Sequence, residues 1–356
     1  MGMMKNKLRV ALLFGGRSAE HEVSLTSAAA IYRNLDPAKF RVDSLFIDKS
    51  GQWRLAESPL LAPEKLNQGQ SFSFLPWGNE LPAPSLAADI YFPVLHGPFG
   101  EDGTIQGLFE VADVPYVGAT VLASAAGMDK VIAKALFSAR GLPIADFLVL
   151  KEQAWRRQHE DCLGSIHNHF NVPFYVKPAN LGSSVGITKV KDPAQTEAAV
   201  ELAFRYDQKI LVEKNIPGRE LECSVLGNEN PQASLPGEII PHREFYDYRD
   251  KYHEGKTKFG IPAELPPDVI EQIQALSLEA FQAIACSGMA RVDFFLREDT
   301  QELILNEINT IPGFTQISMY PKLWEVSGIP FPRLLEELIE LGLQRHRSRK
   351  RNLEWT

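Results

Sequence analysis

Hydrophobic positions in the first third of the chain alternate between short continuous runs and a helical repeat. Residues 8–14 form an apolar run, and residues 22–35 then place apolar side chains on one helical face, which predicts a strand followed by a helix. Apolar runs at 41–47 and 90–95 predict further strands. Strands alternating with helices favour a parallel α/β domain that binds ligands at the carboxyl ends of its strands.

Two segments in this region break the pattern. Residues 50–88 are rich in Pro, Ser, Gly and Leu without clear periodicity, so we expect an irregular surface insertion. A helix predicted over 130–139 is followed by Gly141 and Pro143, the residues that commonly end a helix. We therefore place the end of an N-terminal domain at residue 129.

The remaining two thirds predict two smaller mixed units. Strands at 174–177 and 185–190, joined by a Gly-Ser turn and followed by a helix at 195–206, favour a small α+β lid domain over 130–212. A C-terminal α+β domain over 213–356 is introduced by a strand at 210–213. Its other predicted elements are strands at 219–226, 290–296 and 303–308 and a helix at 331–341.

Composition narrows the class of protein. The chain has 356 residues, 44% of them hydrophobic and 23% charged, which is typical of a globular protein with two or three domains. The formal net charge of -8 argues against broad nucleic-acid binding and favours small-molecule partners. Three cysteines far apart in the sequence predict a reducing compartment. No apolar run approaches the roughly 20 residues of a membrane span, so we expect a cytoplasmic protein.

The stretch KPANLGSSVG, which begins at Lys177, has the ingredients of a phosphate-binding turn. Gly and Ser residues, including Ser183 and Ser184, let backbone N–H groups approach an anion closely, and the lysine supplies a positive charge. The lysine precedes the glycine, which is the reverse of the order in a Walker A loop.

Acidic and amide side chains mark two late strands. Arg291 and Asp293 share one face of the first strand, and Glu307 and Asn309 share one face of the second. Converging carboxylate and amide oxygens suit Mg²⁺, although a single such residue is more often a polar strand end in water. The N–H of Gly313, with Arg291, could stabilise an oxyanion, or the Pro-Gly pair could simply end the strand.

Seven stretches of the sequence together resemble the ATP-grasp superfamily. Over almost the whole chain, the sequence resembles the D-alanine–D-alanine ligase family. The resemblance implies an ATP-grasp fold with an N-terminal Rossmann-like domain, a lid subdomain and a C-terminal α+β domain. The stretches that carry it are GGRSAEHEVSL from Gly15, HGPFGEDGTIQG from His96, KPANLGSSVG, ILVEK from Ile210, EFYDYRDKY from Glu244, ARVDFF from Ala290 and NEINTIPGFTQISMYP from Asn306.

The resemblance implies an ATP site. Lysines would contact the phosphates, residues 213–216 would hold the adenine, and Glu220 would bind the ribose. Two Mg²⁺ ions, or Mn²⁺ in their place, would bind Asp293, Glu307 and Asn309. The implied ATP-binding residues are Lys130, Lys177, Ser183, Ser184, Glu213, Lys214, Ile216, Glu220, Lys251, Asn306 and Glu307.

It also implies a site for two amino acids. Glu20 would bind the ammonium group of the first D-alanine, and Tyr252 would contact both Ser183 and Glu20. Ser318 and Met319 would line the pocket of the second substrate. His96 would lie at the substrate site, although a lone histidine is more often a hydrogen-bonded structural residue.

The implied reaction is ATP-dependent joining of two D-alanine molecules through D-alanyl phosphate, for peptidoglycan synthesis. Arg291 and Gly313 would stabilise the tetrahedral intermediate, and the amine proton would pass to the departing phosphate or to Ser183 and Tyr252. Two alternatives remain: a D-alanine–D-lactate ligase, against which Tyr252 argues, and a non-catalytic ATP-binding module. The family also implies a homodimer and a monovalent cation.

Overall fold

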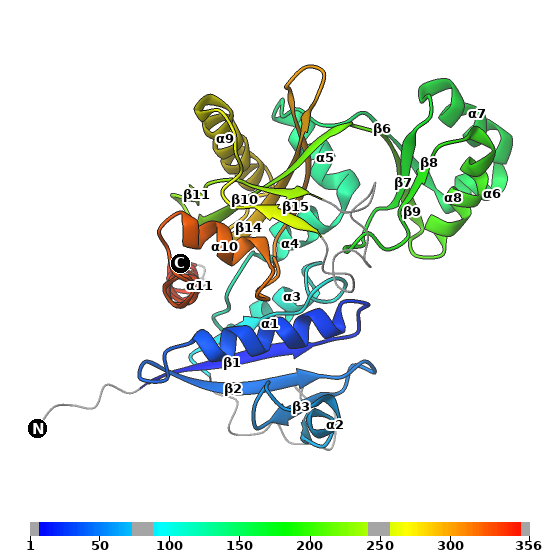
Figure 1. Ribbon diagram of the computed structural model, residues 1–356. Helices are drawn as coiled ribbons and strands as arrows, with labels where there is room; N and C mark the ends of the chain where they lie inside the picture. Colours follow the sequence, from blue (N-terminus) through cyan, green and yellow to red (C-terminus); the bar gives the residue numbers. More distant parts are fainter. Residues whose placement is uncertain (1–6, 73–87, 241–256, 350–356) are drawn as a thin grey trace, which may run out of the picture.

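The first sheet of the protein is mixed rather than wholly parallel. The computed structural model describes residues 7–72, 88–240 and 257–349 (Figure 1). Strands β1 (Leu8–Gly15), β2 (Phe40–Ile47) and β5 (Ile90–Pro93) are parallel, and the sheet order is β4-β3-β2-β1-β5. The expected strands and the helix α1 (His21–Asn34) are confirmed, and they bring the carboxyl ends of β1 and β5 to one edge.

The prediction of an irregular insertion at 50–88 is wrong in its first part. Strand β3 (Trp53–Ala56) pairs antiparallel with β2, helix α2 (Pro63–Leu66) follows, and β4 (Gln70–Phe72) pairs with β3. Strands of three or four residues are too short to show an alternating pattern, and the pairing of β3 with β2 and of β4 with β3 supplies their hydrogen bonds. Residues 73–87 lie outside the described residues.

The lid contains a four-stranded antiparallel sheet in the order β6-β9-β7-β8. The expected boundary between residues 212 and 213 falls inside β9, so the lid sheet continues to Lys214; the three-part division itself remains our proposal. The strands are β6 (Phe147–Lys151), β7 (Phe174–Pro178), β8 (Thr188–Val190) and β9 (Lys209–Lys214), and the helices are α6 (Glu152–Arg157), α7 (His159–His169), α8 (Thr196–Phe204) and the 3₁₀ turn η1 (Pro193–Gln195).

A third, antiparallel sheet forms the body of the C-terminal part. It runs in the order β13-β12-β10-β14-β15, with β11 beside β10, and helix α9 (Pro267–Ala283) packs on it (Figure 1). Its strands are β10 (Gly218–Gly227), β11 (Gln232–Ala233), β12 (Gly237–Ile240), β13 (Lys258–Gly260), β14 (Gly288–Arg297) and β15 (Leu303–Asn309).

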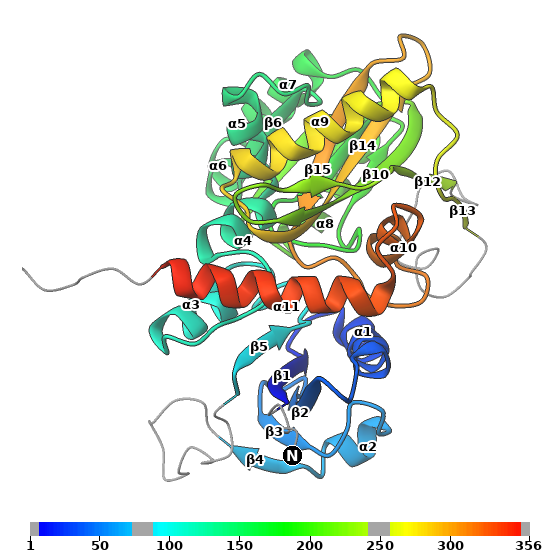
Figure 2. The same cartoon turned by 90° about the vertical axis from the view of Figure 1, so that its left-hand side faces the viewer.

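Helix α11 (Phe331–Ser348) lies between the first and third sheets (Figure 2). Its apolar side chains Leu334 and Leu338 share a buried cluster with Phe92 of the first sheet and Met289 of the third. The N-terminal and C-terminal parts are therefore packed on one common core. The other helices are α3 (Thr104–Val111), α4 (Val121–Met128), α5 (Lys130–Ala139) and α10 (Met319–Val326).

Arg345 on α11 ties these parts together with its guanidinium group. It donates to the carbonyls of Gly118 and of Tyr116, the latter at 2.9 Å, and to the Ser287 hydroxyl at 3.1 Å. Its guanidinium also lies 4.3 Å from the centre of the Tyr116 ring. Two carbonyls from the N-terminal part and a hydroxyl from the C-terminal part thus share one buried cation.

Arg345→Met is expected to lower the free energy of unfolding by about 3 kcal/mol, because buried carbonyls lose charge-assisted hydrogen bonds. Chemical denaturation measures the change. Arg333→Met on the same helix is the control: Arg333 pairs with Glu336 and Glu337 at the surface and should change stability by less than about 1 kcal/mol. Equal effects of the two substitutions would contradict the assigned role of Arg345.

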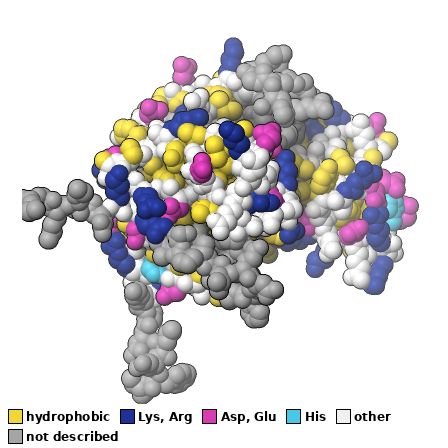
Figure 3. Space-filling view, turned by 90° about the horizontal axis from the view of Figure 1, so that it is seen from below, with side chains coloured by type: hydrophobic (Ala, Val, Ile, Leu, Met, Phe, Trp, Pro, Cys, Tyr) yellow, Lys and Arg dark blue, Asp and Glu magenta, His cyan; other side chains and the backbone are white. Residues whose placement is uncertain are grey.

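One face of the molecule carries side chains of both charges. On the face shown in Figure 3, Lys and Arg side chains are interspersed with Asp and Glu. Within the part of the chain that the structure describes, no helix is both long enough and apolar enough to cross a bilayer.

Candidate active site

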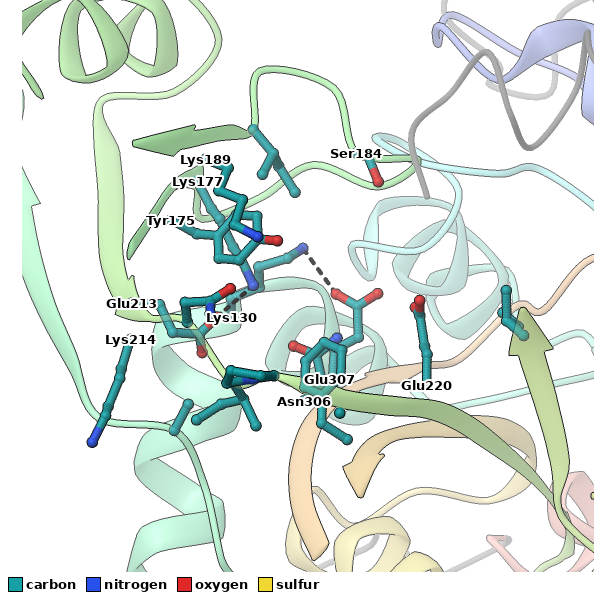
Figure 4. Close-up of a pocket in the computed structure, with 18 of the residues that line it drawn as sticks. Lys130, Tyr175, Lys177, Ser184, Lys189, Glu213, Lys214, Glu220, Asn306 and Glu307 are labelled. Carbon is teal, nitrogen blue, oxygen red and sulfur yellow. Dashed lines mark hydrogen bonds and ion pairs between the residues drawn. The ribbon is translucent and has the colours of Figure 1, made fainter. Parts of the chain in front are cut away.

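A cleft of about 380 Å³ lies between the lid sheet and the third sheet (Figure 4). Both sheets contribute charged and polar side chains to the walls of this cleft. The expected ATP-binding residues that line it are Lys130, Lys177, Ser183, Ser184, Glu213, Lys214, Ile216, Glu220, Asn306 and Glu307. Lys251 lies outside the described residues. The structure therefore brings ten of the expected residues, from four segments of the chain, to one cavity.

Glu213 is the buried anion of this cleft. It is 3% exposed and forms ion pairs with Lys177 of β7 and with Lys134 of α5. Burial alone would raise the pKa of the Glu213 carboxyl, but the two lysine charges outweigh burial and lower the pKa to about 2. The carboxylate is consequently charged at neutral pH.

Lys130 connects the lid turn to the third sheet. Its ammonium donates to the Leu181 carbonyl at 2.7 Å and lies 3.4 Å from the Glu307 carboxylate (Figure 4). Lys214, in contrast, is exposed and points its amine away from this group (Figure 4). Of the three expected lysines that line this cleft, Lys130 and Lys177 are therefore better placed than Lys214 to meet a bound anion.

The Gly-Ser turn of the lid reaches the N-terminal part of the molecule. Ser183 and Ser184 have φ of 50° and 58°, a left-handed backbone that costs energy for residues other than glycine. The Ser183 hydroxyl donates to the Glu20 carboxylate. A Cβ at Gly182 would lie 3.0 Å from the same carboxylate. The expected contacts of Tyr252 with Ser183 and Glu20 lie outside the described residues, and the direct contact between Ser183 and Glu20 was not expected from the sequence.

A second, smaller cleft of about 110 Å³ adjoins the first. Ser183 and Glu307 line both clefts, so a group bound in one can reach a group bound in the other. Gly97 has a φ of 76°, and a Cβ there would lie 2.8 Å from Glu20, so the strand end accommodates only glycine. The expected substrate residues that line this cleft are Glu20, His96, Arg291, Gly313, Ser318 and Met319.

Arg291 lies among carboxylates at the bottom of the second cleft. Its guanidinium donates two hydrogen bonds of 2.7 Å to Asp293 and lies 3.0 Å from Glu222. Burial would lower the pKa of Arg291, but these carboxylates raise it well above its ordinary value. Arg291 is thus a fixed positive charge, and the nearly buried Asp293 lies behind it, lining neither cleft.

The register of β14 and β15 explains how the expected metal ligands meet. Arg291 is opposite Asn309 and Asp293 is opposite Glu307, and opposed residues of an antiparallel pair point to the same face. Glu307 and Asn309 line the second cleft, and their carboxylate and amide oxygens are hard donors that fit Mg²⁺. Both carboxylate oxygens of Asp293 accept hydrogen bonds from Arg291, so Asp293 fits the expected set only on the shared strand face and not by lining a cleft. Among the described residues no three Asp, Glu, His or Cys side chains are grouped as a metal site, so the amide would complete the set.

His96 is almost fully buried and holds two parts of the chain together. Its Nδ1 lies 3.1 Å from the Ile311 carbonyl, and its Nε2 lies 3.2 Å from the hydroxyl of Ser27, which also receives the Phe314 N–H. Burial would lower the pKa of His96, but hydrogen bonding to Glu101 raises it above its ordinary value. The residue lines the second cleft and also positions the turn that carries Gly313.

Several polar residues of the clefts were missed by sequence reasoning. Tyr175 precedes Lys177 by two positions on β7, and Glu222 follows Glu220 by two on β10, so a search for polar residues at strand spacing could have found them. Lys134 gives no such signal, because a lysine in a helix normally faces water. The missed residues that line the clefts are Tyr175, Lys189, Glu238, Glu101, Glu222 and Thr315.

Comparison with known proteins gives consistent matches over nearly the whole chain. The family models for the D-ala D-ala ligase N-terminus and C-terminus match residues 9–119 and 136–340. The D-alanine–D-alanine ligase of Solibacter usitatus is 51% identical over 97% of this chain and 98% of its own length. That of Heliobacterium modesticaldum is 48% identical over 97% of each chain.

Solved structures show the same similarity. The D-alanine–D-alanine ligase of Coxiella burnetii has a TM-score of 0.84 and 41% identity, covering 97% of this chain and 96% of that one. The VanG D-Ala:D-Ser ligase of Enterococcus faecalis has a TM-score of 0.82 and 34% identity, covering 95% and 100%. The expected ATP-grasp fold is confirmed, and the chain belongs to the D-alanine–D-alanine ligase family.

Proposed function

We propose that this protein joins two D-alanine molecules to D-alanyl-D-alanine with cleavage of ATP to ADP and phosphate. The observation that carries the proposal is the contact between Ser183 of the lid turn and Glu20 of the N-terminal part, at the junction of the two clefts. A nucleotide cleft that opens onto an acidic amino-acid site suits transfer of a phosphoryl group to a carboxylate. The names of the relatives identify D-alanine as the substrate to test.

In the first cleft, Lys130 and Lys177 bind the phosphates, the backbone of residues 213–216 holds the adenine, and Glu220 binds the ribose hydroxyls. Side chains of Asp293, Glu307 and Asn309 would hold Mg²⁺ or Mn²⁺. When bound, the metal neutralises phosphate charge and assists phosphoryl transfer. The closing lid turn excludes water from the reactive acyl phosphate.

In the second cleft, Glu20 pairs with the ammonium group of the first D-alanine. The carboxylate of that substrate takes the γ-phosphoryl group of ATP, and ADP leaves. The amine of the second D-alanine then attacks the carbonyl carbon, a C–N bond forms, and the C–O bond to phosphate breaks. Arg291 and the Gly313 N–H stabilise the oxyanion of this step.

The second substrate would bind beside the Gly313 turn. Ser318 accepts the Thr315 N–H at 3.0 Å, and a Cβ at Gly313 would lie only 2.6 Å from the Ser318 oxygen. Glycine at position 313 therefore lets the Ser318 hydroxyl approach the backbone donor. We infer that Ser318 binds the carboxylate of the second D-alanine and that Met319 lines its side-chain pocket.

Glu20→Gln is expected to raise the KM for D-alanine about tenfold or more, because an ammonium group loses a charged partner in a partly buried site. The Kd for ATP should change little, which separates this effect from loss of the nucleotide cleft. Glu22→Gln is the control, since Glu22 is exposed and pairs with Lys49 at 2.9 Å. An unaltered KM for D-alanine would show that Glu20 does not bind the ammonium group of the substrate.

Phosphate release from ATP and Mg²⁺ tests the function itself. We expect release with D-alanine and none with L-alanine, and adding D-lactate should leave D-alanyl-D-alanine as the main product by mass spectrometry. Depsipeptide as the main product would instead make the protein a D-alanine–D-lactate ligase. Absence of D-alanine-dependent release from folded, ATP-binding protein would reject the substrate assignment.

The expected homodimer, monovalent cation and cytoplasmic location stay predictions, as do the roles of Lys251 and Tyr252. Light scattering of the purified protein checks the first, with about twice the mass of the chain as the expected result. Replacement of K⁺ by a bulky organic cation in the assay buffer checks the second.

A further inference from the structure

Lys134 is a buried lysine behind the nucleotide cleft that the proposed mechanism does not use. It is 2% exposed and lines neither cleft. Its ammonium forms the ion pair with Glu213, lies 3.3 Å from the Asn306 carbonyl, and faces the Phe147 ring at 6.0 Å from the ring centre. Nothing about this position allows contact with a bound nucleotide, so any effect on the nucleotide must pass through its neighbours.

The charges around Glu213 are not balanced one to one. Lys134 pairs with one oxygen of the carboxylate, and Lys177 pairs with the other. Two positive charges and one negative charge leave a net charge of +1. Of the two lysines only Lys177 lines the cleft, so the excess charge is presented there.

Without Lys134 the same carboxylate would form a neutral pair with Lys177. The ammonium of Lys177 would still face the cleft, but its field would be cancelled by an anion in direct contact. At a site of low dielectric constant this cancellation is large, because interactions between charges are screened less than in water.

We propose that Lys134 is a positioning residue that neutralises Glu213, so that Lys177 presents an undiminished positive charge to the nucleotide phosphates. The inference rests on the nucleotide cleft of the proposed function, but it does not depend on the amino-acid substrate. The contact of Lys134 with the Asn306 carbonyl supports it, because that contact anchors Glu213 next to the strand that carries Glu307.

Binding of nucleotide to the full-length protein tests the inference. Titration calorimetry gives the Kd for ATP and for adenosine, which has no phosphates. Lys134→Met, of similar length and without charge, should weaken ATP binding about tenfold or more and adenosine binding less than about threefold. Lys134→Arg keeps the charge and should bind ATP nearly as the unaltered protein does.

The double variant Lys134→Met with Glu213→Gln is the decisive comparison. Removing the anion together with Lys134 returns the net charge to +1, so ATP affinity should recover most of what the single variant loses. If Lys134→Met alone does not fold, the double variant is compared with the unaltered protein, and the two Kd values for ATP should differ by less than about threefold. Equal weakening of ATP and adenosine binding, or a folded double variant that binds ATP no better than the single one, would overturn the inference.

The two proposals fail in different ways. A protein that binds ATP but makes no D-alanyl-D-alanine rejects the proposed function and leaves the role of Lys134 open to the same titration. A protein that makes the dipeptide, and whose Lys134→Met variant binds ATP normally, rejects only the role of Lys134.

Discussion

Arg291→Ala is expected to lower kcat about a hundredfold to a thousandfold, the usual cost of removing one oxyanion donor. Arg291 lines the second cleft but not the first, so the Kd for ATP should change little. The substitution also leaves Asp293 and Glu222 without their cation, and their mutual repulsion should lower stability. Steady-state kinetics and ATP titration on the same preparation separate these effects.

Arg297→Ala is a closely matched control. Arg297 lies on the same strand, β14, and donates to Asp299 through two nitrogens, at 3.0 and 2.7 Å, as Arg291 does to Asp293. The Arg297 pair is at the surface, outside both clefts, so kcat should be unaltered. A change confined to KM in Arg291→Ala, with kcat kept, would reject the oxyanion role.

Glu307→Gln is expected to lower kcat about a thousandfold, since a metal ion contributes several kcal/mol and each 1.4 kcal/mol is a factor of ten. Glu307 lines both clefts, is opposite Asp293 across the sheet, and lies 3.4 Å from Lys130. Its amide would keep the shape of the side chain but lose the negative charge that attracts a divalent cation.

Binding of Mn²⁺ in the presence of ADP gives this prediction a readout other than turnover. Electron paramagnetic resonance should show weaker binding of Mn²⁺ to Glu307→Gln than to the unaltered protein. Glu302→Gln at the exposed start of the same hairpin, where Glu302 pairs with Arg297 at 3.4 Å, should leave Mn²⁺ binding unchanged. Normal Mn²⁺ binding by Glu307→Gln would exclude Glu307 as a ligand.

Elements with long, regular patterns could be predicted from the sequence. Strand β1 and helix α1 carry clear apolar repeats, and both were expected within one or two residues of their bounds. Strands β3 and β4 were missed, because three or four residues show no period and these strands depend on pairing, β3 with β2 and β4 with β3. The local pattern of apolar residues thus predicts long elements that bury a whole face. Whether a short strand forms depends on its pairing with a neighbouring strand in the folded protein.

The candidate site divides in the same way. Strand spacing alone predicted Asp293 and Glu307 on two late strands, and the register of β14 and β15 brings them opposite each other. The expected position at a strand end is wrong for Asp293, which lies in the middle of β14. The contact of Ser183 with Glu20 joins residues 163 positions apart, and only resemblance to a family could suggest it. Lys134 and Arg345 were missed entirely, because a buried cation cannot be distinguished from a solvated one until its partners are known.

D-Alanine labelled with ¹⁸O in its carboxylate provides the most direct test of the account. The protein is incubated with labelled D-alanine, ATP and Mg²⁺, and both products are examined by mass spectrometry. An acyl phosphate intermediate predicts that one of the two labelled carboxylate oxygens of the first D-alanine moves into inorganic phosphate. The other labelled oxygen should remain as the peptide carbonyl oxygen of D-alanyl-D-alanine. Unlabelled phosphate, or no dipeptide from protein that binds ATP, would contradict the proposed reaction.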